Sequence, residues 1–374
     1  MSKYEVIIIG TSHHNTLSMV RAFGLQGIKP TLLLYGCHKS YISKSKFVKD
    51  THYFDSANEV ISHLKYNANR ERNVYIISCT DEIAHKLDEA QCELLPYYNF
   101  FRTKKQGDLT YYMDKQKQLD LAKQVGFCAP WSSLYTKELC NETISIPCII
   151  KPLASINGGK HIRICNSLCE YVDSIREFDG IDTLVQELII KDSELVIVGL
   201  TVKGKTIIPA YIDKHREIKG GTTYSTVRSI DSLPKNIQES CVRMVEQIGY
   251  EGLWGIECIV SKGLYYFLEL NLRNDATTYA VAVAGVNMPN MYVQLMENND
   301  CMVDAHIVDI KSIVEHNDLI YAIKHKIPIG RWIKECRGAM CKYLLFKGDN
   351  KPVFALLQEY SEILLKKVIK RKGK

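Results

Sequence analysis

Several features that would assign this chain to common protein classes are missing. No apolar run approaches the roughly 18 residues of a membrane span, and the N-terminus opens on a strand-like run without a charged leader. The 13 cysteines lack the paired spacing of a zinc finger. We therefore expect a cytoplasmic protein without a transmembrane segment, in which the cysteines are small buried hydrophobic residues.

Two glycine-rich nucleotide signatures are also missing. The loop from Gly10 to Asn15 lacks the repeated glycines of a dinucleotide fingerprint, which ranks an NAD-dependent oxidoreductase last among the functions considered. The loop from Ser155 to Lys160 contains Gly158 and Gly159, but the Gly-Lys-Ser/Thr ending and the helix of a Walker loop are absent.

The overall composition is that of an ordinary globular protein. The 374 residues are enough for two or three domains with hydrophobic cores, and 46% are hydrophobic and 24% charged. The formal net charge of +6 is mild. It requires no nucleic-acid partner, and we expect none.

The first 110 residues alternate strand-like and helical patterns. Strands are predicted at 4–9, 31–34 and 74–77, and helices at 16–25, 58–66 and 81–90. This alternation indicates a doubly wound α/β layer. Ligands of such layers bind beyond the carboxyl ends of the strands, where His13 and His14 lie. Substrate contact is one interpretation of these histidines, and simple exposure is the more common one.

The segment from Trp254 to Asp275 has the most informative pattern. Two runs rich in β-branched and aromatic residues, 255–260 and 264–270, flank the turn signal at 261–263 and predict a β-hairpin. Its polar residues alternate with apolar ones, so the polar side chains of each arm lie on one face of the strand.

Glu257 and Glu269 stand on opposite arms of this hairpin. Register permitting, they face each other, while Glu269, Asn271 and Arg273 share one face. Two carboxylates and an amide oxygen gathered there favour a hard cation such as Mg²⁺ or Mn²⁺. The alternative is a solvated hairpin face with surface ion pairs.

The pattern Glu, twelve residues, then Glu-x-Asn-x-Arg resembles the metal-binding end of the ATP-grasp ligases, nearest to the D-aspartate and L-amino-acid ligase branch with a biotin carboxylase-like core. The resemblance implies that Glu257, Glu269 and Asn271 bind the metal and that Arg273 is catalytic, steadying the phosphorylated substrate. It covers about residues 1–300.

Other motifs follow in the family order. Asp114 is a suitable N-cap for a helix over 115–125. By resemblance, Lys115 at its start and Lys151 at the end of an apolar strand contact phosphate, and the loop with Gly158 and Gly159 covers the phosphates. Without the resemblance, a Gly-Gly turn and solvated lysines explain the same residues.

The strand predicted at 183–190 resembles the family's adenine-binding hinge. The resemblance assigns adenine to Gln186, Glu187 and Leu188, and the ribose to Glu194. A strand is predicted at 207–212, followed by a polar loop from Asp213 to Ser225. This loop resembles one in the D-aspartate branch that faces the carboxylate substrate.

One arginine lies within that predicted loop and another lies three residues after it. Arg216 and Arg228 are candidates for bidentate binding of a substrate carboxylate. Surface salt bridges are an equal alternative for both.

The predicted architecture is mixed α/β and α+β. An N-terminal Rossmann-like domain (1–110) precedes an ATP-grasp domain (111–300) with a lid subdomain at about 145–190, and ATP lies between two α+β subdomains. Residues 301–374 have an uncertain fold, with a strand at 343–346, a turn at 348–350 and a basic terminal helix at 354–369.

The resemblance implies a carbon–nitrogen ligase that uses ATP and Mg²⁺ or Mn²⁺. It would activate a carboxylate as an acyl phosphate and couple it to an amine, releasing ADP and phosphate. The partners are then two small-molecule substrates, with a homodimer possible. The alternative is an ATP-binding regulatory or assembly protein of the same fold without ligase turnover.

Overall fold

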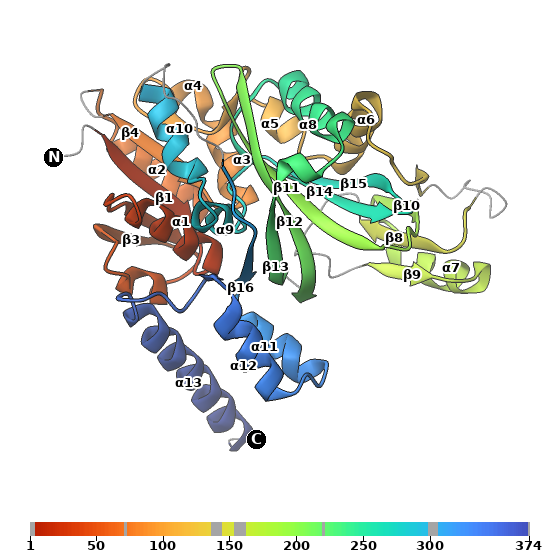
Figure 1. The fold of residues 1–374 in the computed structure, drawn as a ribbon. Helices are drawn as coiled ribbons and strands as arrows, with labels where there is room; N and C mark the ends of the chain where they lie inside the picture. The colour runs from red at the N-terminus through yellow and green to blue at the C-terminus, as the bar shows by residue number, and fades with distance from the viewer. Residues whose placement is uncertain are drawn as a thin grey trace.

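The computed structural model describes residues 4–70, 73–135, 144–152, 162–218, 221–297 and 306–372. These residues form three sheets with helices packed around them (Figure 1). In the described part of the chain, no helix combines the length and apolar character needed to cross a bilayer.

The first sheet is parallel and has the strand order β3-β2-β1-β4-β5. Its strands are β1 (Glu5–Gly10), β2 (Thr31–Tyr35), β3 (Asp50–Phe54), β4 (Val74–Ser78) and β5 (Asn99–Phe100). The helices between and after them are α1 (His14–Gly24), α2 (Ala57–Tyr66), α3 (Asp81–Glu89) and α4 (Gln91–Leu94), with the short 3-10 turn η1 (Tyr41–Lys44). The predicted doubly wound layer is confirmed. From β1 the chain adds β2 and β3 on one side and then β4 and β5 on the other, so the strand order reverses between β1 and β4.

The second sheet is small and antiparallel, in the order β7-β10-β8-β9. Its elements are β7 (Ser132–Leu134), β8 (Cys148–Pro152), β9 (Arg163–Cys165), α7 (Leu168–Ile175), η3 (Arg176–Phe178) and β10 (Thr183–Glu187). Ile150, Tyr171, Phe178 and Val185 form its own core. β10 ends three residues before the predicted strand end at 190.

The third sheet is the largest, with the order β15-β14-β11-β12-β13-β16-β17 and β6 beside β14. Its strands are β6 (Arg102–Thr103), β11 (Ser193–Val202), β12 (Lys205–Ile218), β13 (Gly221–Ser229), β14 (Tyr250–Ser261), β15 (Leu264–Asn271), β16 (Ile310–Ile313) and β17 (Cys341–Lys342). The predicted hairpin is confirmed as β14 and β15, and Glu257 pairs directly with Glu269 in its register.

One prediction in this sheet is wrong. The polar segment from Asp213 to Ser225 was expected to be a loop, but Asp213–Ile218 continues β12 and Gly221–Ser229 forms β13. The segment is polar because alternate side chains of these strands face a cavity instead of a core. Polarity alone therefore does not distinguish this strand from a loop.

The remaining helices are α5 (Asp108–Tyr111), α6 (Lys115–Val125), α8 (Lys235–Ile248), α9 (Thr278–Val283), α10 (Met288–Glu297), α11 (Glu315–Lys324), α12 (Ile329–Gly338) and α13 (Lys351–Lys372), with η4 at Ile230–Ser232. As predicted, α6 begins after Asp114, whose carboxylate accepts hydrogen bonds from the backbone N–H groups of Gln116 and Lys117.

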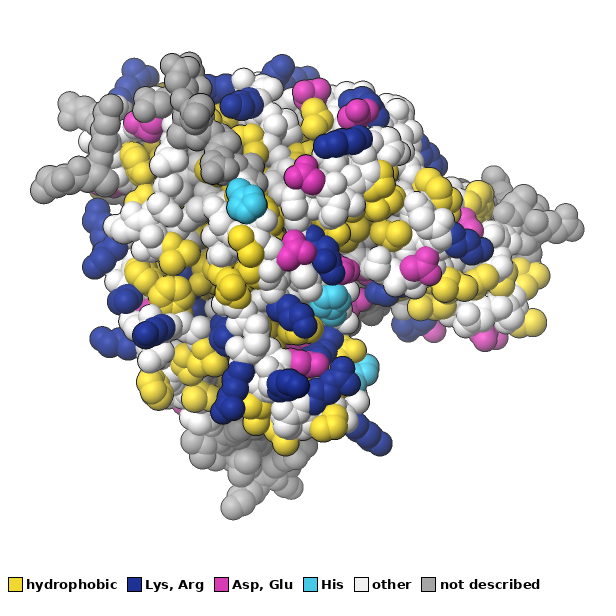
Figure 2. Space-filling model, in the orientation of Figure 1, with side chains coloured by type: hydrophobic (Ala, Val, Ile, Leu, Met, Phe, Trp, Pro, Cys, Tyr) yellow, Lys and Arg dark blue, Asp and Glu magenta, His cyan; other side chains and the backbone are white. Residues whose placement is uncertain are grey.

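The first and third sheets share a continuous hydrophobic core, which includes Ile8, Phe23, Phe101, Trp254 and Tyr292. The two sheets are therefore packed as one body. On the face shown in Figure 2, basic and acidic side chains are interspersed with hydrophobic ones, in keeping with the small net charge.

The strand predicted at 343–346 is wrong, and Cys341–Lys342 pairs with β16 instead. The backbone after β17 has other partners: the carbonyls of Tyr343 and Leu344 accept hydrogen bonds from Arg21. The N–H groups of Leu344 and Leu345 donate to Glu315. The predicted terminal helix is confirmed within α13.

Candidate active site

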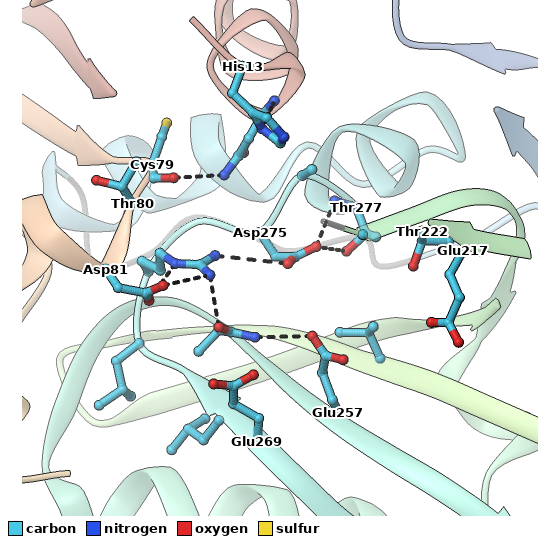
Figure 3. A pocket seen from close by; sticks show the side chains of 18 of the residues that line it. His13, Cys79, Thr80, Asp81, Glu217, Thr222, Glu257, Glu269, Asp275 and Thr277 are labelled. Carbon is cyan, nitrogen blue, oxygen red and sulfur yellow. Dashed lines mark hydrogen bonds and ion pairs between the residues drawn. The ribbon is translucent and has the colours of Figure 1, made fainter. Parts of the chain in front are cut away.

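A cavity of about 1120 Å³ lies between the first and third sheets (Figure 3). The first sheet contributes the loops after β1 and β4, which carry His13 and Thr80. These loops flank the point where the strand order reverses, which is where doubly wound sheets bind ligands. The opposite wall is one face of the third sheet.

That face is continuous across six strands. Paired residues in a sheet point to the same side. The register therefore directs one set of side chains toward the cavity: Glu269 and Asn271 on β15, Glu257 on β14, Glu194 and Val196 on β11, Lys214 on β12, Ser225 on β13 and Ser312 on β16. The predicted metal ligands and the predicted ribose contact, Glu194, therefore share one surface.

The Glu257 carboxylate of the hairpin is held by a hydrogen bond from Asn271, which Arg273 holds in turn. Asn271 donates from Nδ2 to Oε1 of Glu257 over 3.3 Å, and Arg273 donates from Nη2 to Oδ1 of Asn271 over 3.0 Å. Burial raises the pKa of Glu257 above its usual range, and Lys214 offsets part of this effect. Glu269 lines the cavity beside them.

Lys214 is a site residue that the sequence did not reveal. Its Nζ lies 2.7 Å from Oε1 of Glu194 and 2.7 Å from Oε2 of Glu257. Burial alone would lower the pKa of this lysine, but the carboxylates of Glu257 and Glu194 outweigh it and raise that pKa. Lys214 could have been found if the segment had been predicted as a strand. It would then lie on the same face as Ile212 and Arg216, two positions away on either side.

Arg273 connects the two walls of the cavity. Its guanidinium binds both carboxylate oxygens of Asp81 at the start of α3, at 2.6 and 3.1 Å, and Nη1 lies 4.0 Å from Asp275. Bidentate pairing of this kind fixes the orientation of the planar group. Asp81 and Asp275 are further site residues that the sequence analysis missed.

The second sheet contributes a lysine near the cavity. Nζ of Lys151 donates to Oε1 of Gln186 over 3.0 Å. Burial, and then the nearby charge of Lys115, lowers the pKa of Lys151 to about 8. Because the charges of Lys151 and Lys115 repel each other, an anion bound beside them would be favourable. Lys115 itself lines the cavity.

The hinge residues make backbone and side-chain contacts with the second sheet. Oε2 of Glu187 accepts from the N–H of Trp131 at 3.3 Å, and the N–H of Leu188 donates to the carbonyl of Pro147 at 2.9 Å. Gly158 and Gly159 lie outside the described residues.

The two candidate arginines for substrate binding have partners elsewhere. Arg216 is buried and pairs with Asp318 at 2.9 Å and with Glu335, over the ring of Tyr224. Arg228 lies 3.1 Å from Asp309 and 3.6 Å from Asp213. Neither arginine is among the residues that line the cavity.

The two histidines after β1 differ, because His13 is exposed at its surface and His14 is not. His14 begins α1 and is buried, with only 4% of its surface accessible. His13 caps the helix, because its Nδ1 accepts the N–H of Asn15 at 3.2 Å. Both side chains line the cavity, and burial lowers both pKa values. The expectation of simple exposure is therefore wrong for His14.

The donor set fits a divalent cation without forming a complete metal cage. Within the described residues, no three His, Cys, Asp or Glu side chains gather into a metal-binding group. The hairpin instead offers two carboxylates and one amide oxygen, which are the hard ligands that Mg²⁺ prefers, and Mg²⁺ ordinarily takes its other ligands from water and phosphate.

Residues 112–277 match the ATP-grasp domain model, so this segment of the chain is an ATP-grasp domain. A D-alanine–D-alanine ligase of Fervidobacterium nodosum is 25% identical over 146 residues, which are 36% of this chain and 46% of that protein. A formate-dependent phosphoribosylglycinamide formyltransferase of Chlorobium phaeobacteroides is 25% identical over 180 residues, covering 45% of this chain and 46% of that protein. The chain thus spans under half the length of these curated relatives.

Solved structures extend the likeness of fold over most of the chain. An N5-carboxyaminoimidazole synthetase from Staphylococcus aureus has a TM-score of 0.67 at 11% identity, covering 87% of this chain and 88% of that one. The L-amino acid ligase from Bacillus licheniformis has a TM-score of 0.63 at 12% identity, covering 84% and 80%. The predicted fold class, an ATP-grasp fold behind an N-terminal α/β layer, is confirmed.

Proposed function

We propose that this protein is an ATP-dependent ligase that activates a carboxylate as an acyl phosphate and couples it to an amine, releasing ADP and phosphate. The observation that carries the proposal is the row of Glu257, Glu269 and Asn271 in one register on the cavity wall, with Arg273 bonded to Asn271. It lies within the segment that matches the ATP-grasp domain.

ATP is the proposed cosubstrate, and the cavity has room for it. At about 1120 Å³ it exceeds the 300–1,000 Å³ that is typical of small-molecule sites. The neighbours include an N5-carboxyaminoimidazole synthetase complexed with ADP and a biotin carboxylase domain with MgADP. We assign Lys115 and Lys151 to the phosphates, and Gly158 and Gly159 to the loop that covers them.

The remaining nucleotide contacts follow the family order. Gln186, Glu187 and Leu188 take adenine, and Glu194 takes the ribose hydroxyls. Lys214 is added to the phosphate contacts, because it is the cation that lies next to both Glu194 and Glu257.

Glu257, Glu269 and Asn271 would hold Mg²⁺ or Mn²⁺, which neutralises phosphate charge when bound. Arg273 binds the carboxylate and then the acyl phosphate by charge-assisted hydrogen bonds. A carboxylate is a poor electrophile until its oxygen becomes part of a leaving group. The task of the protein is therefore positioning and charge neutralisation.

The proposal includes a setting: cytoplasmic, with small-molecule substrates. A homodimer is part of it because a dimer is described for the biotin carboxylase domain of Hydrogenobacter thermophilus 2-oxoglutarate carboxylase. Light scattering on the purified chain tests the dimer.

The central experiment measures ADP and phosphate release with pools of carboxylates and amines. Substrate-stimulated release supports the ligase, whereas ATP binding without release supports a regulatory or assembly protein. Glu269→Gln should reduce turnover at least about 100-fold and leave the fold intact. Glu239→Gln, on an exposed part of α8, is the matched control. Near-normal turnover of Glu269→Gln would contradict the assignment.

A further inference from the structure

Asp275 is a carboxylate in the cavity that has no role in the proposed ligase reaction so far. It lies four residues beyond Asn271, between Asp81 and Thr277 across the middle of the cavity (Figure 3). Its side chain is 18% exposed. It is therefore accessible to a ligand in the cavity without being a freely solvated surface group.

One oxygen of Asp275 is held in place. Oδ1 accepts the backbone N–H of Thr277 at 2.8 Å and its hydroxyl at 2.5 Å. Oδ2 lies 4.0 Å from Nη1 of Arg273, which is an ion-pair distance that is too long for a hydrogen bond. The carboxylate is thus preoriented, with one oxygen available to a ligand beside Arg273.

Four neighbouring groups that line the cavity, those of His13, Asp81, Cys79 and His14, are unsuited to accept a proton. Nδ1 of His13 is occupied by the N–H of Asn15, so the neutral ring carries its proton on Nε2. Both oxygens of Asp81 are bound to Arg273. Burial raises the pKa of the Cys79 thiol to about 12, and His14 is buried beside two other histidines.

We propose that Asp275 binds the amine substrate through Oδ2 and accepts its proton as the amide bond forms. The inference rests on the proposed ligase function, in which Arg273 holds the acyl phosphate. Because Oδ2 lies 4.0 Å from that guanidinium, an amine bound to Asp275 is adjacent to the activated carbonyl. Holding two reactants in such proximity is a large part of the catalysis of bond formation.

Amide formation conserves atoms and charge in this arrangement. The uncharged amine donates one N–H to Oδ2, and its lone pair forms the new N–C bond. The C–O bond to phosphate breaks, and its electron pair leaves with the phosphate. The nitrogen loses its proton to Asp275, which then passes that proton to the departing phosphate.

Hydroxylamine separates this role from the phosphorylation half of the reaction. It is small, uncharged at neutral pH and strongly nucleophilic, so it converts acyl phosphates to hydroxamates without help from a protein base. The wild-type protein is first given MgATP, hydroxylamine and a pool of carboxylates. The carboxylates that yield hydroxamate are then tested with a pool of amino acids as amines.

Asp275→Asn is the informative variant, because asparagine keeps the oxygen that accepts from Thr277 and preserves the turn. Its amine-dependent product formation should fall about 100-fold or more, while its hydroxamate formation stays within about 3-fold of the wild type. Thr277→Val, which removes one hydrogen bond to Oδ1, should show a smaller loss with the same selectivity. Asp231→Asn, whose carboxylate is 82% exposed on η4, is the control and should change neither rate.

Two results would overturn the role of Asp275 alone. Equal losses of hydroxamate and amide would place it in the phosphorylation half, and unchanged amide formation would remove it from the reaction. If wild-type protein gives no hydroxamate with any carboxylate, the proposed ligase function fails first, and the inference fails with it.

Discussion

At the scale of single residues, the charges on the cavity wall explain one another. The Glu257 side chain is largely buried, with 22% of its surface exposed, and this burial raises its pKa. Lys214, whose side chain is 9% exposed, lies between this carboxylate and Glu194. Removing one partner of a buried ion pair leaves an uncompensated charge, which is costly. The lysine therefore stabilises the wall when no divalent cation neutralises it.

Lys214→Met tests this arrangement. We expect a loss of about 3 kcal/mol in the free energy of unfolding, because two largely buried carboxylates lose their cation. MgATP should recover part of that loss if the same carboxylates bind the metal. Urea denaturation with and without MgATP measures both effects. Lys205→Met, at the exposed start of β12, is the control, and equal losses with and without MgATP would argue against a metal at Glu257.

The histidines near the cavity predict a dependence of stability on pH. Burial, followed by the nearby His13, lowers the pKa of His316 to about 4. The unfolded value is about 6.5. The unfolded chain therefore binds a proton that the folded chain excludes, so this contribution to stability is present above pH 6.5 and is lost as the pH falls toward 4.

His316→Gln should flatten that dependence by about 2 kcal/mol between pH 7 and pH 4.5, after discounting for partial exposure. Urea denaturation at pH values across this interval gives the comparison with the wild type. His38→Gln serves as the reference, because the His38 side chain is 87% exposed. A variant with the same pH profile as the wild type would show that His316 is not protonated differently in the folded and unfolded states.

The same residues show how much of the site the sequence predicts. The placement of Glu257, Glu269 and Asn271 on one face of the hairpin could be predicted. A short turn signal sets the register of the two strands, and strand alternation decides which side chains share a face. The placement of Lys214 and Asp81 could not be predicted, because their relation to the hairpin depends on strand order and on packing between sheets. The partners of Arg216, Asp318 and Glu335, could not be predicted either, because they lie over a hundred residues later in the chain.

At the scale of elements, Gly199 on β11 leaves the space that the ring of Trp254 on β14 occupies. A Cβ atom at this position would lie 2.1 Å from Cζ2 of Trp254, which is buried against it. Trp254 begins the run that leads to Glu257 on the same strand. The packing of the strand that carries Glu257 therefore depends on a glycine on the neighbouring strand.

Gly199→Ala should destabilise the protein by about 3 kcal/mol, since the ring of Trp254 or the strand must move. Thermal unfolding followed by tryptophan fluorescence reports both the loss of stability and the displacement of the ring. Gly330→Ala in α12 is the contrast, because a Cβ atom at that position would meet no other atom within 4 Å, and helix propensity favours alanine there by about 1 kcal/mol. Equal effects of the two changes would disprove the packing argument.

Element types were predicted best where burial is uniform on both sides. β1, β2 and β4 are continuous apolar runs, and all three were predicted from the sequence. β12 and β13 were missed as strands where one face meets the cavity. Polar residues usually indicate a loop, but here they line a cavity from within strands. The wrong loop prediction at 213–225 therefore falls on the cavity wall.

At the scale of the whole molecule, the C-terminal segment is bound to helix α1 of the N-terminal layer by a buried ion pair. The Arg21 side chain on α1 is fully buried, and its Nη2 lies 3.3 Å from Oδ2 of Asp349. The same guanidinium donates to the carbonyls of Tyr343 and Leu344, at 2.5 and 3.0 Å. Asp349 also accepts from Ser45 and from the N–H of Lys46. The sequence did not predict this connection, because its partners are more than 300 positions apart.

Arg21→Met therefore tests whether the C-terminal segment is a structural part of the N-terminal unit. We expect it to lower the free energy of unfolding by about 3–5 kcal/mol, because Asp349 loses its buried counter-ion and two carbonyls lose their donor. The double change with Asp349→Asn should recover part of that loss, since it removes the unpaired charge. Arg163→Met is the control: its partner Glu177 and Arg163 itself are about half exposed, and such pairs contribute about 0–1 kcal/mol. Urea denaturation measures both losses. If Arg21→Met lost no more stability than Arg163→Met, the C-terminal segment would pack independently of α1. The cavity, which Tyr343 lines, would then not depend on that contact.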